Sequence, residues 1–386
     1  MGKNGKIEGL SLLGGPLHRL GIRLGLVRGG TNTSLLGAAL GAFLWTVLIA
    51  LTLIEGIGEK IFSLSVIGGH VRLLAAIPLF FLCEALVDPR MTEFVRYIVR
   101  SEIVPRNALP ALGSEVARIT RWKDSWLPEG ICLLAAVLLS LFGNKLAASG
   151  TTAAFDPRIA VGEIPLTAQW YWIVCLPFFK FLILRWVWRL GLWGYFLWRV
   201  VKLELHLVPT HPDGYAGLGY LELVQIHFAP LVVAISAVQS ASYAEDISTG
   251  AIPFEALYPA IAMILIVDAA LFLGPLFIFS RRLWACRLKG MSNYMEFAAS
   301  YVNGFDKKWR GADASPEPLL GTPDLQSLAD LANSMNIVRN MRVVPVSQLL
   351  LINLAMAALL PIIPLILFKY PVVELAEKFF RTLIGI

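Results

Sequence analysis

The sequence predicts an all-α membrane protein, a polytopic bundle of about seven transmembrane helices with cytoplasmic helical hairpins. The chain of 386 residues is 57% hydrophobic and only 16% charged, with a mean hydropathy of +0.68. In soluble proteins roughly a quarter of the residues are charged, so we expect lipid to be the main solvent. The stretches that are long and apolar enough to cross a bilayer as helices are residues 35–55, 67–87, 131–147, 168–188, 220–242, 258–280 and 349–368.

The composition argues against several other classes of protein. The four cysteines form no CxxC pair, which disfavours a disulfide framework and a zinc site. The net charge of +6 is attributed to cytoplasmic loops, because no soluble basic segment is interleaved with aromatic residues as in a nucleic-acid-binding domain. Residues 1–34 contain no signal-peptide pattern. We therefore expect no cofactor and no nucleic-acid partner.

The N-terminal part of the chain combines a basic segment with the first two spans. Residues 10–28 alternate leucines with glycines and basic side chains, which favours an interfacial helix; a loose basic tail is the alternative. Gly37 and Gly41 form a GxxxG motif that would let two helices approach closely. The second span begins with His70 and Arg72, which lie near enough to its end to reach water.

A polar segment, residues 88–127, separates the second span from the third. Asp88 and Pro89 have the pattern of an N-cap followed by a first-turn proline, so a new helix is expected to begin there. Apolar side chains then recur at helical spacing until Pro105. We interpret this segment as a cytoplasmic helical hairpin.

The fourth span is expected to continue as a helix to Leu205. Tryptophans and arginines alternate along this extension, as they do where a helix leaves a bilayer and runs along its surface. Cation–π pairing or an aromatic binding site is the alternative. The expected interfacial belt consists of Trp186, Trp188, Trp193 and Trp198 with Arg185, Arg189 and Arg199.

The distribution of basic residues predicts the orientation. The segments 1–34, 88–127, 185–219 and 281–346 hold 25 of the 33 Lys and Arg residues. The positive-inside rule therefore places the N-terminus in the cytoplasm and the C-terminus outside. The expected organisation is a basic N-terminus (1–34), two spans (35–87), a cytoplasmic helical segment (88–127), two spans (128–188), an interfacial helix and loop (189–219), two spans (220–280), a second cytoplasmic helical segment (281–346), a last span (347–368) and an amphipathic tail (369–386).

Ionisable residues within the spans are costly and call for an explanation. With a rise of about 1.5 Å per residue, Lys180 is expected about 18 Å below the outer face and Asp268 about 15 Å. His227 is expected about 20 Å from that face in an apolar core of roughly 30 Å. We predict that these three residues and Glu222 line an ion or proton path, although Glu84 and Glu222 lie close enough to the cytoplasm to reach water. The alternative is an Asp268–Lys180 ion pair that only fixes helix packing.

The loop 208–219, VPTHPDGYAGLG, joins the fourth-span helix to the fifth span. A proline and Gly214 favour a tight turn, in which Asp213 accepts hydrogen bonds from the backbone amides that follow. Alternatively, exposed amides at the start of the next helix could hold an anion or a phosphate. A further alternative is metal binding by His206, His211 and Asp213, because imidazole and carboxylate groups suit divalent ions.

Two stretches carry a resemblance to known sequences. LVPTHPDGYAGLGYLE at 207–222 and DLQSLADLANSMNIVRNMRVVPVS at 324–347 resemble a group of bacterial multi-pass membrane proteins of unassigned function. The resemblance covers roughly the second half of the chain. It implies a bacterial inner-membrane setting and transfers no functional residue.

The functional hypothesis is a channel or transporter for an ion or a small solute. It is expected to be a homo-oligomer because ion channels usually are and because the GxxxG motif of the first span offers a packing face. A second hypothesis is a non-catalytic scaffold or sensor whose segments 88–127 and 281–346 bind a cytoplasmic protein partner. A third is a membrane-embedded, metal-dependent enzyme built on the loop 208–219. The chain contains no Walker, HExxH or GxSxG motif, which disfavours an enzyme.

Overall fold

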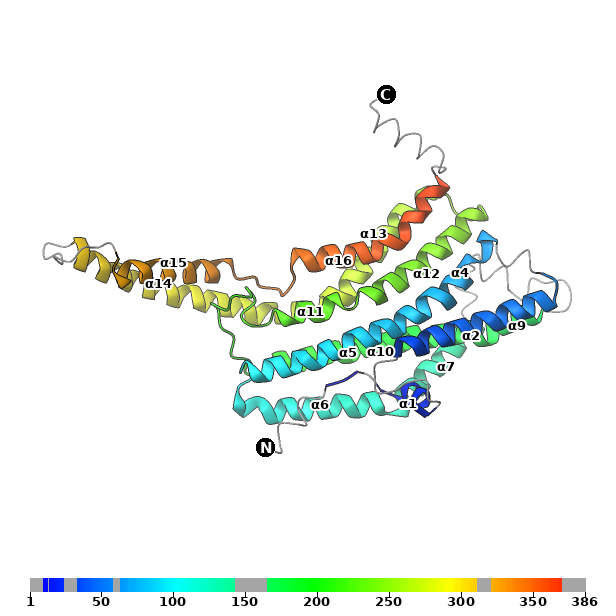
Figure 1. Cartoon of the computed structure of the whole chain (residues 1–386), viewed down its shortest axis with the longest axis horizontal. Coiled ribbons are helices and arrows are strands. Elements are labelled where there is room, and N and C mark those ends of the chain that lie inside the picture. Colours follow the sequence, from blue (N-terminus) through cyan, green and yellow to red (C-terminus); the bar gives the residue numbers. More distant parts are fainter. Residues whose placement is uncertain are drawn as a thin grey trace, which may run out of the picture.

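The chain folds as an all-α bundle, as the sequence predicts (Figure 1). The computed structural model describes residues 10–12, 14–23, 33–57, 63–142, 165–310 and 321–369, and no strand occurs among them. The α-helices are α1 (Pro16–Arg23), α2 (Thr33–Ile54), α4 (Ile67–His70), α5 (Ile77–Arg100), α6 (Leu109–Asp124), α7 (Trp126–Phe142), α9 (Leu166–Trp170), α10 (Leu176–Val201), α11 (Tyr220–Ile226), α12 (Ala229–Ser248), α13 (Leu257–Asp268), α14 (Ser280–Arg310), α15 (Pro323–Asn340) and α16 (Gln348–Leu359). Shorter elements are the 3-10 helices η2 (Leu64–Val66), η4 (Arg106–Ala108), η7 (Phe254–Ala256), η9 (Gly274–Phe279) and η10 (Leu360–Phe368), and the π-helical segments η3 (Val71–Ala76), η6 (Tyr171–Cys175) and η8 (Ala269–Leu273).

Five of the expected spans correspond to helices that are long and apolar enough to cross a membrane. The bent pair α6 and α7, with 45° between the two helices, would add a sixth if it forms one broken span. The expected span 168–188 is not among them, so the count of seven is not confirmed. Residues 143–147 of the third expected span and 370–386 of the expected tail lie outside the described residues. The five helices are Thr33–Ile54, Ile67–Arg100, Tyr220–Ser248, Phe254–Arg310 and Gln348–Phe368.

The expected start of a helix at Asp88 is wrong, because α5 continues through Pro89 to Arg100. A proline inside a helix removes one backbone hydrogen bond, which is tolerated where neighbouring helices pack around it. Asp88 does not cap a helix. It is buried and accepts hydrogen bonds from Ser11 Oγ at 2.9 and 3.0 Å.

The helix that contains the sixth expected span extends far beyond it. The helical run Phe254–Arg310 is continuous, whereas the span was expected to end at residue 280. α14 and α15 pack against each other as a hairpin that projects from one end of the bundle (Figure 1). We call this end the hairpin end, and we call the opposite end, which carries the turn 249–256, the far end.

The GxxxG motif of α2 is used for packing within the chain. A Cβ atom on Gly37 would lie 2.6 Å from Phe81 Cβ, and one on Gly41 would overlap the carbonyl oxygen of Leu73. The motif therefore lets α2 approach α5 and η3 closely. Because these contacts occupy the motif, it no longer supports the expected homo-oligomer, which stays a prediction.

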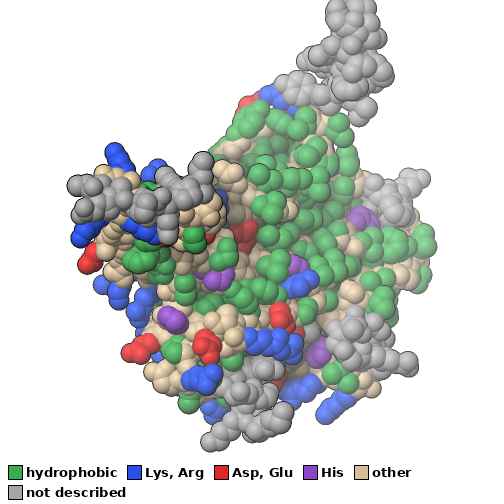
Figure 2. All heavy atoms as spheres, turned by 60° about the vertical axis from the view of Figure 1, so that its left-hand side comes forward, with side chains coloured by type: hydrophobic (Ala, Val, Ile, Leu, Met, Phe, Trp, Pro, Cys, Tyr) green, Lys and Arg blue, Asp and Glu red, His purple; other side chains and the backbone are tan. Residues whose placement is uncertain are grey.

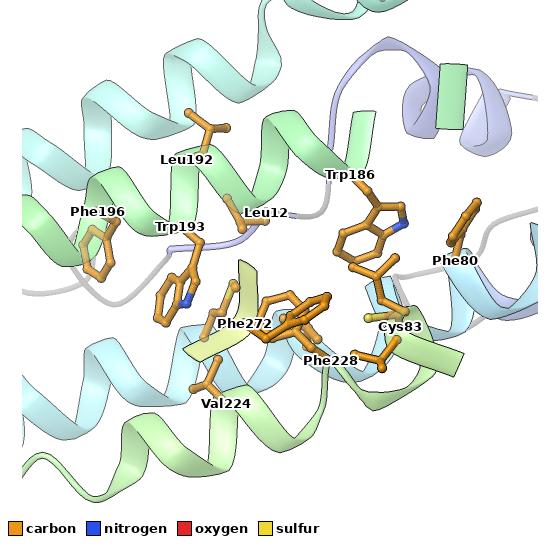
Figure 3. Close-up of a cluster of buried hydrophobic side chains, with 14 of the residues drawn as sticks. Leu12, Phe80, Cys83, Trp186, Leu192, Trp193, Phe196, Val224, Phe228 and Phe272 are labelled. Atoms are coloured by element: carbon orange, nitrogen blue, oxygen red, sulfur yellow. The ribbon is translucent and has the colours of Figure 1, made fainter. Parts of the chain in front are cut away.

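Aromatic side chains fill the core where α5, α10 and α12 meet (Figure 3). The rings of Trp186 and Phe228 have centroids 6.4 Å apart, and those of Phe228 and Phe272 are 5.7 Å apart. Leu12, from the N-terminal segment, lies in the same cluster (Figure 3). On the outside, apolar side chains cover a broad continuous area, whereas charged side chains gather on the hairpin and in the lower part of the view (Figure 2). Such an apolar surface suits contact with lipid.

Candidate functional site

Four charged side chains meet inside the bundle, where α5, α7 and α10 come together. Arg185 Nη1 lies 3.1 Å from Glu84 Oε2, and Arg185 Nε lies 3.1 Å from Glu129 Oε1. Arg189 Nη1 lies 2.8 Å from the same Glu84 oxygen. The side chains of Glu84 and Arg185 are each only 3% exposed. We call Glu84, Glu129, Arg185 and Arg189 the central charge cluster.

Helical geometry explains why the two arginines reach the same carboxylate. Arg185 and Arg189 are four residues apart on α10, so both side chains leave the same face of the helix. Buried charges are tolerated when they are paired and hydrogen-bonded. The prediction that both arginines belong to an interfacial belt is therefore wrong, and Trp186 and Trp193 of that belt are buried as well. Glu84, which was expected to reach water, is enclosed with them.

The N-terminal segment covers the central charge cluster. The carbonyl oxygen of Gly14 accepts hydrogen bonds from Arg185 Nη2 and Arg189 Nη2, each at 3.3 Å. Gly14 has a φ of +147°, a conformation that favours glycine. A Cβ atom on Gly15 would overlap the carboxylate of Glu129. Two consecutive glycines thus bring the backbone directly onto the charges.

The expected interfacial helix over residues 10–28 is found only in part among the described residues. Only α1 is helical there, and Leu10 and Leu12 are buried in the bundle core. The hydrogen bond of Ser11 to Asp88 fastens the same segment to α5. Leu10 and Leu12 therefore pack against other parts of the protein. This packing removes their apolar surface from water, as insertion into a membrane surface would.

A small cavity of about 10 Å³ lies beside the central charge cluster. This volume is close to the smallest that holds one water molecule. Leu12, from the N-terminal segment, lines this cavity. Its walls combine charged and aromatic side chains and consist of Leu12, Glu84, Val87, Asp88, Met91, Trp186, Arg189 and Phe228.

A second group of buried polar side chains lies nearer the far end. Arg72 Nη1 donates to the Tyr171 hydroxyl at 2.6 Å, and Arg72 Nη2 donates to Ser242 Oγ at 3.3 Å. Glu245 accepts a hydrogen bond from the backbone N–H of Gly68 at 2.6 Å and interacts electrostatically with Arg72. Arg72 is 7% exposed, so the expectation that it reaches water is wrong. We call Arg72, Tyr171, Ser242 and Glu245 the far cluster.

The three π-helical segments coincide with buried polar residues. Arg72 lies in η3, Tyr171 begins η6, and η8 begins directly after Asp268. A π-helical turn is rare and is frequently found at functional sites, because the extra residue redirects the side chains around it. The irregular backbone therefore marks these positions as candidates for function.

The predicted trio of Asp268, Lys180 and His227 is not joined by any hydrogen bond or ion pair in the part of the chain that the structure describes. Lys180 Nζ donates to the carbonyl oxygen of Leu139 in α7 at 3.0 Å. Arg90 Nε donates to His227 Nε2 at 3.3 Å. Asp268 is 6% exposed, and its Oδ2 atom has no hydrogen-bond partner. The three residues thus have separate environments, and their role in an ion path stays a prediction.

In the loop 208–219, the Asp213 carboxylate binds the backbone that follows it. The N–H groups of Tyr215 and Gly219 donate to Asp213 Oδ1 and Oδ2, each at 2.8 Å. The N–H of Gly217 donates to both oxygens, at 3.2 and 3.1 Å. The predicted turn is present, and it leaves these amides bound to Asp213 rather than to an external anion.

The histidines of this region do not form a metal site with Asp213. His211 Nδ1 lies 2.9 Å from Asp213 Oδ1, whereas His206 is exposed and its backbone N–H donates to the Ile103 carbonyl at 2.8 Å. Within the described ranges, no three His, Cys, Asp or Glu side chains come close enough to hold a metal ion. Gly214 has a φ of +71°, so its role is conformational.

The two stretches that carry the sequence resemblance contact each other. The backbone N–H of Arg342 donates to the Gly214 carbonyl at 2.9 Å. Arg342 Nη1 also donates to the Tyr215 hydroxyl at 2.8 Å. Residues 207–222 and 324–347 therefore form one junction, which ties the loop to the segment between α15 and α16.

Glu222 belongs to this junction as well. It accepts hydrogen bonds from Ser347 Oγ and from the Tyr215 hydroxyl, the latter at 3.4 Å. Burial raises the pKa of Tyr215, which keeps its hydroxyl neutral and able to donate. Glu222 thus has a structural role at the start of α11, and a role on an ion path stays a prediction.

The central charge cluster is not evident from the sequence when its members are considered one at a time. Two arginines four residues apart on an apolar helix are a signal for a shared buried partner. Glu84 in an apolar span and Glu129 before the third span supply the matching charges. The glycine pair Gly14–Gly15 was a further signal for a close backbone approach.

Comparisons with known proteins supply no function for this chain. No protein-family model, no curated protein and no solved structure matches it. The geometry and chemistry of the buried clusters are therefore the basis for a functional proposal.

Replacing Asp213 by Ala removes the acceptor of three backbone amides and should lower the free energy of unfolding by about 1–3 kcal/mol. Asp213→Asn, which keeps one acceptor oxygen, should fall between this variant and the wild type. Glu204→Ala, at an exposed position, is the control and should change stability by less than about 0.5 kcal/mol. Thermal unfolding in detergent gives the comparison. Inorganic phosphate should leave the melting temperature unchanged; stabilisation by phosphate would favour an anion site in the loop.

Proposed function

We propose that this chain is a membrane transport protein, a carrier or channel for an ion or a small solute in a bacterial inner membrane. The observation that carries the proposal is the pair of buried polar clusters within an apolar helical bundle. Ionisable groups at bilayer depth are costly, and they commonly mark the path of a transported species. The positive-inside rule favours a cytoplasmic location for the hairpin end.

The two clusters are separated along the helices that they share. Arg72 and Glu84 are twelve residues apart on one helical run, a distance of about 18 Å along its axis. Between them, the rings of Phe80 and Phe179 stack with their centroids 5.9 Å apart. Ile77 is buried in the same interval. A layer of apolar side chains thus lies between the central charge cluster and the far cluster.

This layered arrangement supports a carrier in a closed conformation. Charged clusters offer binding groups at two depths, and the apolar layer between them opposes leakage of ions. Passage of a solute would require the aromatic rings to separate. The π-helical segments η3 and η6 border this layer, and irregular turns of this kind can absorb a change in helix geometry.

The N-terminal segment supports the same interpretation. Gly14 contacts both arginines of the central charge cluster, and Leu12 lines the small cavity beside it. The N-terminal segment lies outside the long helices, so it can move without breaking them. Its displacement would expose the central charge cluster to solvent.

Removal of the Glu84–Arg189 pair should abolish most transport while keeping the buried charge balanced. In the double variant Glu84→Gln/Arg189→Gln, Arg185 retains Glu129 as its partner. Purified protein is reconstituted in liposomes, and fluxes of H⁺, Na⁺, K⁺ and Cl⁻ are measured with ion-sensitive dyes. We expect wild-type flux of at least one ion above empty vesicles, and a decrease of about tenfold or more in the variant, since a lost charge-assisted contact is worth about 1.5–3 kcal/mol.

The matched control is Glu102→Gln/Arg106→Gln, which removes an exposed ion pair with an N–O distance of 3.1 Å. Its flux should equal that of the wild type. Wild-type protein that is folded in the bilayer but passes none of the four ions would contradict the ionic form of the proposal. Equal flux in both double variants would remove the central charge cluster from the path.

A second candidate function is a membrane scaffold or sensor that binds a protein partner through α14. The supporting observation is an exposed apolar stripe on the projecting hairpin. Its residues recur at spacings of four and seven, so they share one side of the helix. An exposed apolar stripe of this kind often marks an interaction surface. The stripe consists of Trp284, Leu288, Met295 and Val302.

Site-specific photocrosslinking in cells tests this second candidate. A photoreactive residue at Met295 should give a discrete crosslinked product with a protein partner. The same residue at Asn293, which is exposed but lies about 160° around the helix, should give none. Products from both positions, or from neither, would argue against the scaffold hypothesis.

A further inference from the structure

Asp268 is a buried carboxyl group that neither cluster uses. It is the last residue of α13, which packs against α12 and α16. The side chain is 6% exposed, and Oδ2 has no hydrogen-bond partner. Burial of a charged carboxylate oxygen without a hydrogen-bond partner is strongly unfavourable, and protonation of the group removes this cost.

In the described part of the chain, no charged side chain on the elements that pack against α13 pairs with Asp268. α16 and η8 contain no titratable residue. The titratable residues of the other adjacent elements lie close to the turn at the far end, whereas Asp268 is ten residues beyond Tyr258, or about 15 Å along the helix. Most of them are acids, which would only add repulsion. These residues are Tyr243, Glu245 and Asp246 on α12, Glu255 in η7 and Tyr258 on α13.

Ser236 provides a second buried polar group at the same depth. It lies twelve residues before the end of α12, or about 18 Å from the far-end turn, and Asp268 lies eleven residues after the start of α13, or about 17 Å. Ser236 is fully buried, and its Oγ atom also has no hydrogen-bond partner. A hydroxyl can both donate and accept a hydrogen bond, but none joins Ser236 Oγ to Asp268 Oδ2 in this conformation.

The backbone beside Asp268 is irregular. The π-helical segment η8 starts at the next residue, and the 3-10 helix η9 follows it. The helical pitch therefore changes twice in succession, at η8 and at η9. Such irregular turns allow a local conformational change in this part of the bundle. Such a change could bring water to the carboxyl group without unfolding α13.

We propose that Asp268 is a proton-binding site inside the bundle. In the described conformation the carboxyl group holds its proton, and a rearrangement at η8 that admits water releases it. On release the carboxyl O–H bond breaks and an O–H bond forms on a water molecule, which becomes hydronium; binding is the reverse transfer. Proton binding at Asp268 does not depend on solute flux. This proposal and the proposed transport function can therefore fail separately.

Infrared spectroscopy of the full-length protein in lipid bilayers tests this proposal. The wild type and Asp268→Asn are compared near neutral pH, with and without ¹³C-labelled aspartate carboxyl groups. We expect the wild type to show a carbonyl stretch of a protonated carboxylic acid that shifts on labelling and is missing in Asp268→Asn. Because Asn resembles the neutral acid in size and charge, the two proteins should have the same melting temperature.

Asp306→Asn is the control, since Asp306 is half exposed and lies 3.5 Å from Arg310. Its difference spectrum should contain only the bands of an ionised carboxylate. If Asp268→Asn removes ionised-carboxylate bands instead of the acid band, Asp268 is charged and the proposal is overturned. Loss of the folded state in Asp268→Asn would also contradict it, because a neutral amide should replace a neutral acid without disruption.

Discussion

The pairing of Arg185 with Glu84 and Glu129 is the interaction on which the rest of the structure depends. It connects α10 to α5 and α7 in the interior of the bundle. Breaking a buried pair leaves an uncompensated charge, at a cost of about 3–5 kcal/mol. The position of the N-terminal segment follows from the same pairing, since the Gly14 carbonyl binds the guanidinium groups that the carboxylates hold in place. Stability and the proposed path thus share one set of residues.

Local sequence signals were sufficient for the features that depend on local chemistry. Hydropathy located five membrane-length helices, and the turn residues around Asp213 identified its role as an acceptor of backbone amides. The central charge cluster could not be identified from its residues taken one at a time. An arginine next to tryptophans, such as Arg185 beside Trp186, has the same local sequence in an interfacial belt and in a buried core. Only the packing of α5 and α7 against α10 distinguishes the two.

The expected depth of a charged residue in the bilayer was a poor guide to which charged side chains contact each other. Lys180, His227 and Asp268 were placed at similar levels, but depth fixes one coordinate and leaves the direction of each side chain open. A π-helical segment adds a residue to a turn and rotates the following side chains by about 100°. Segments η6 and η8 occur on the helices of Lys180 and Asp268. The direction of the Lys180 side chain, which follows η6, therefore could not be deduced from spacing alone.

A double-mutant cycle with Glu84→Gln and Arg185→Gln tests most directly whether this buried pairing holds the bundle together. The free energy of unfolding is measured for the wild type, both single variants and the double variant under the same bilayer-like conditions. The buried pair predicts a coupling energy of at least about 1 kcal/mol, so that the double variant is more stable than the sum of the single effects requires. Single effects that add within about 0.5 kcal/mol would show that the two side chains do not interact, and would contradict the pairing.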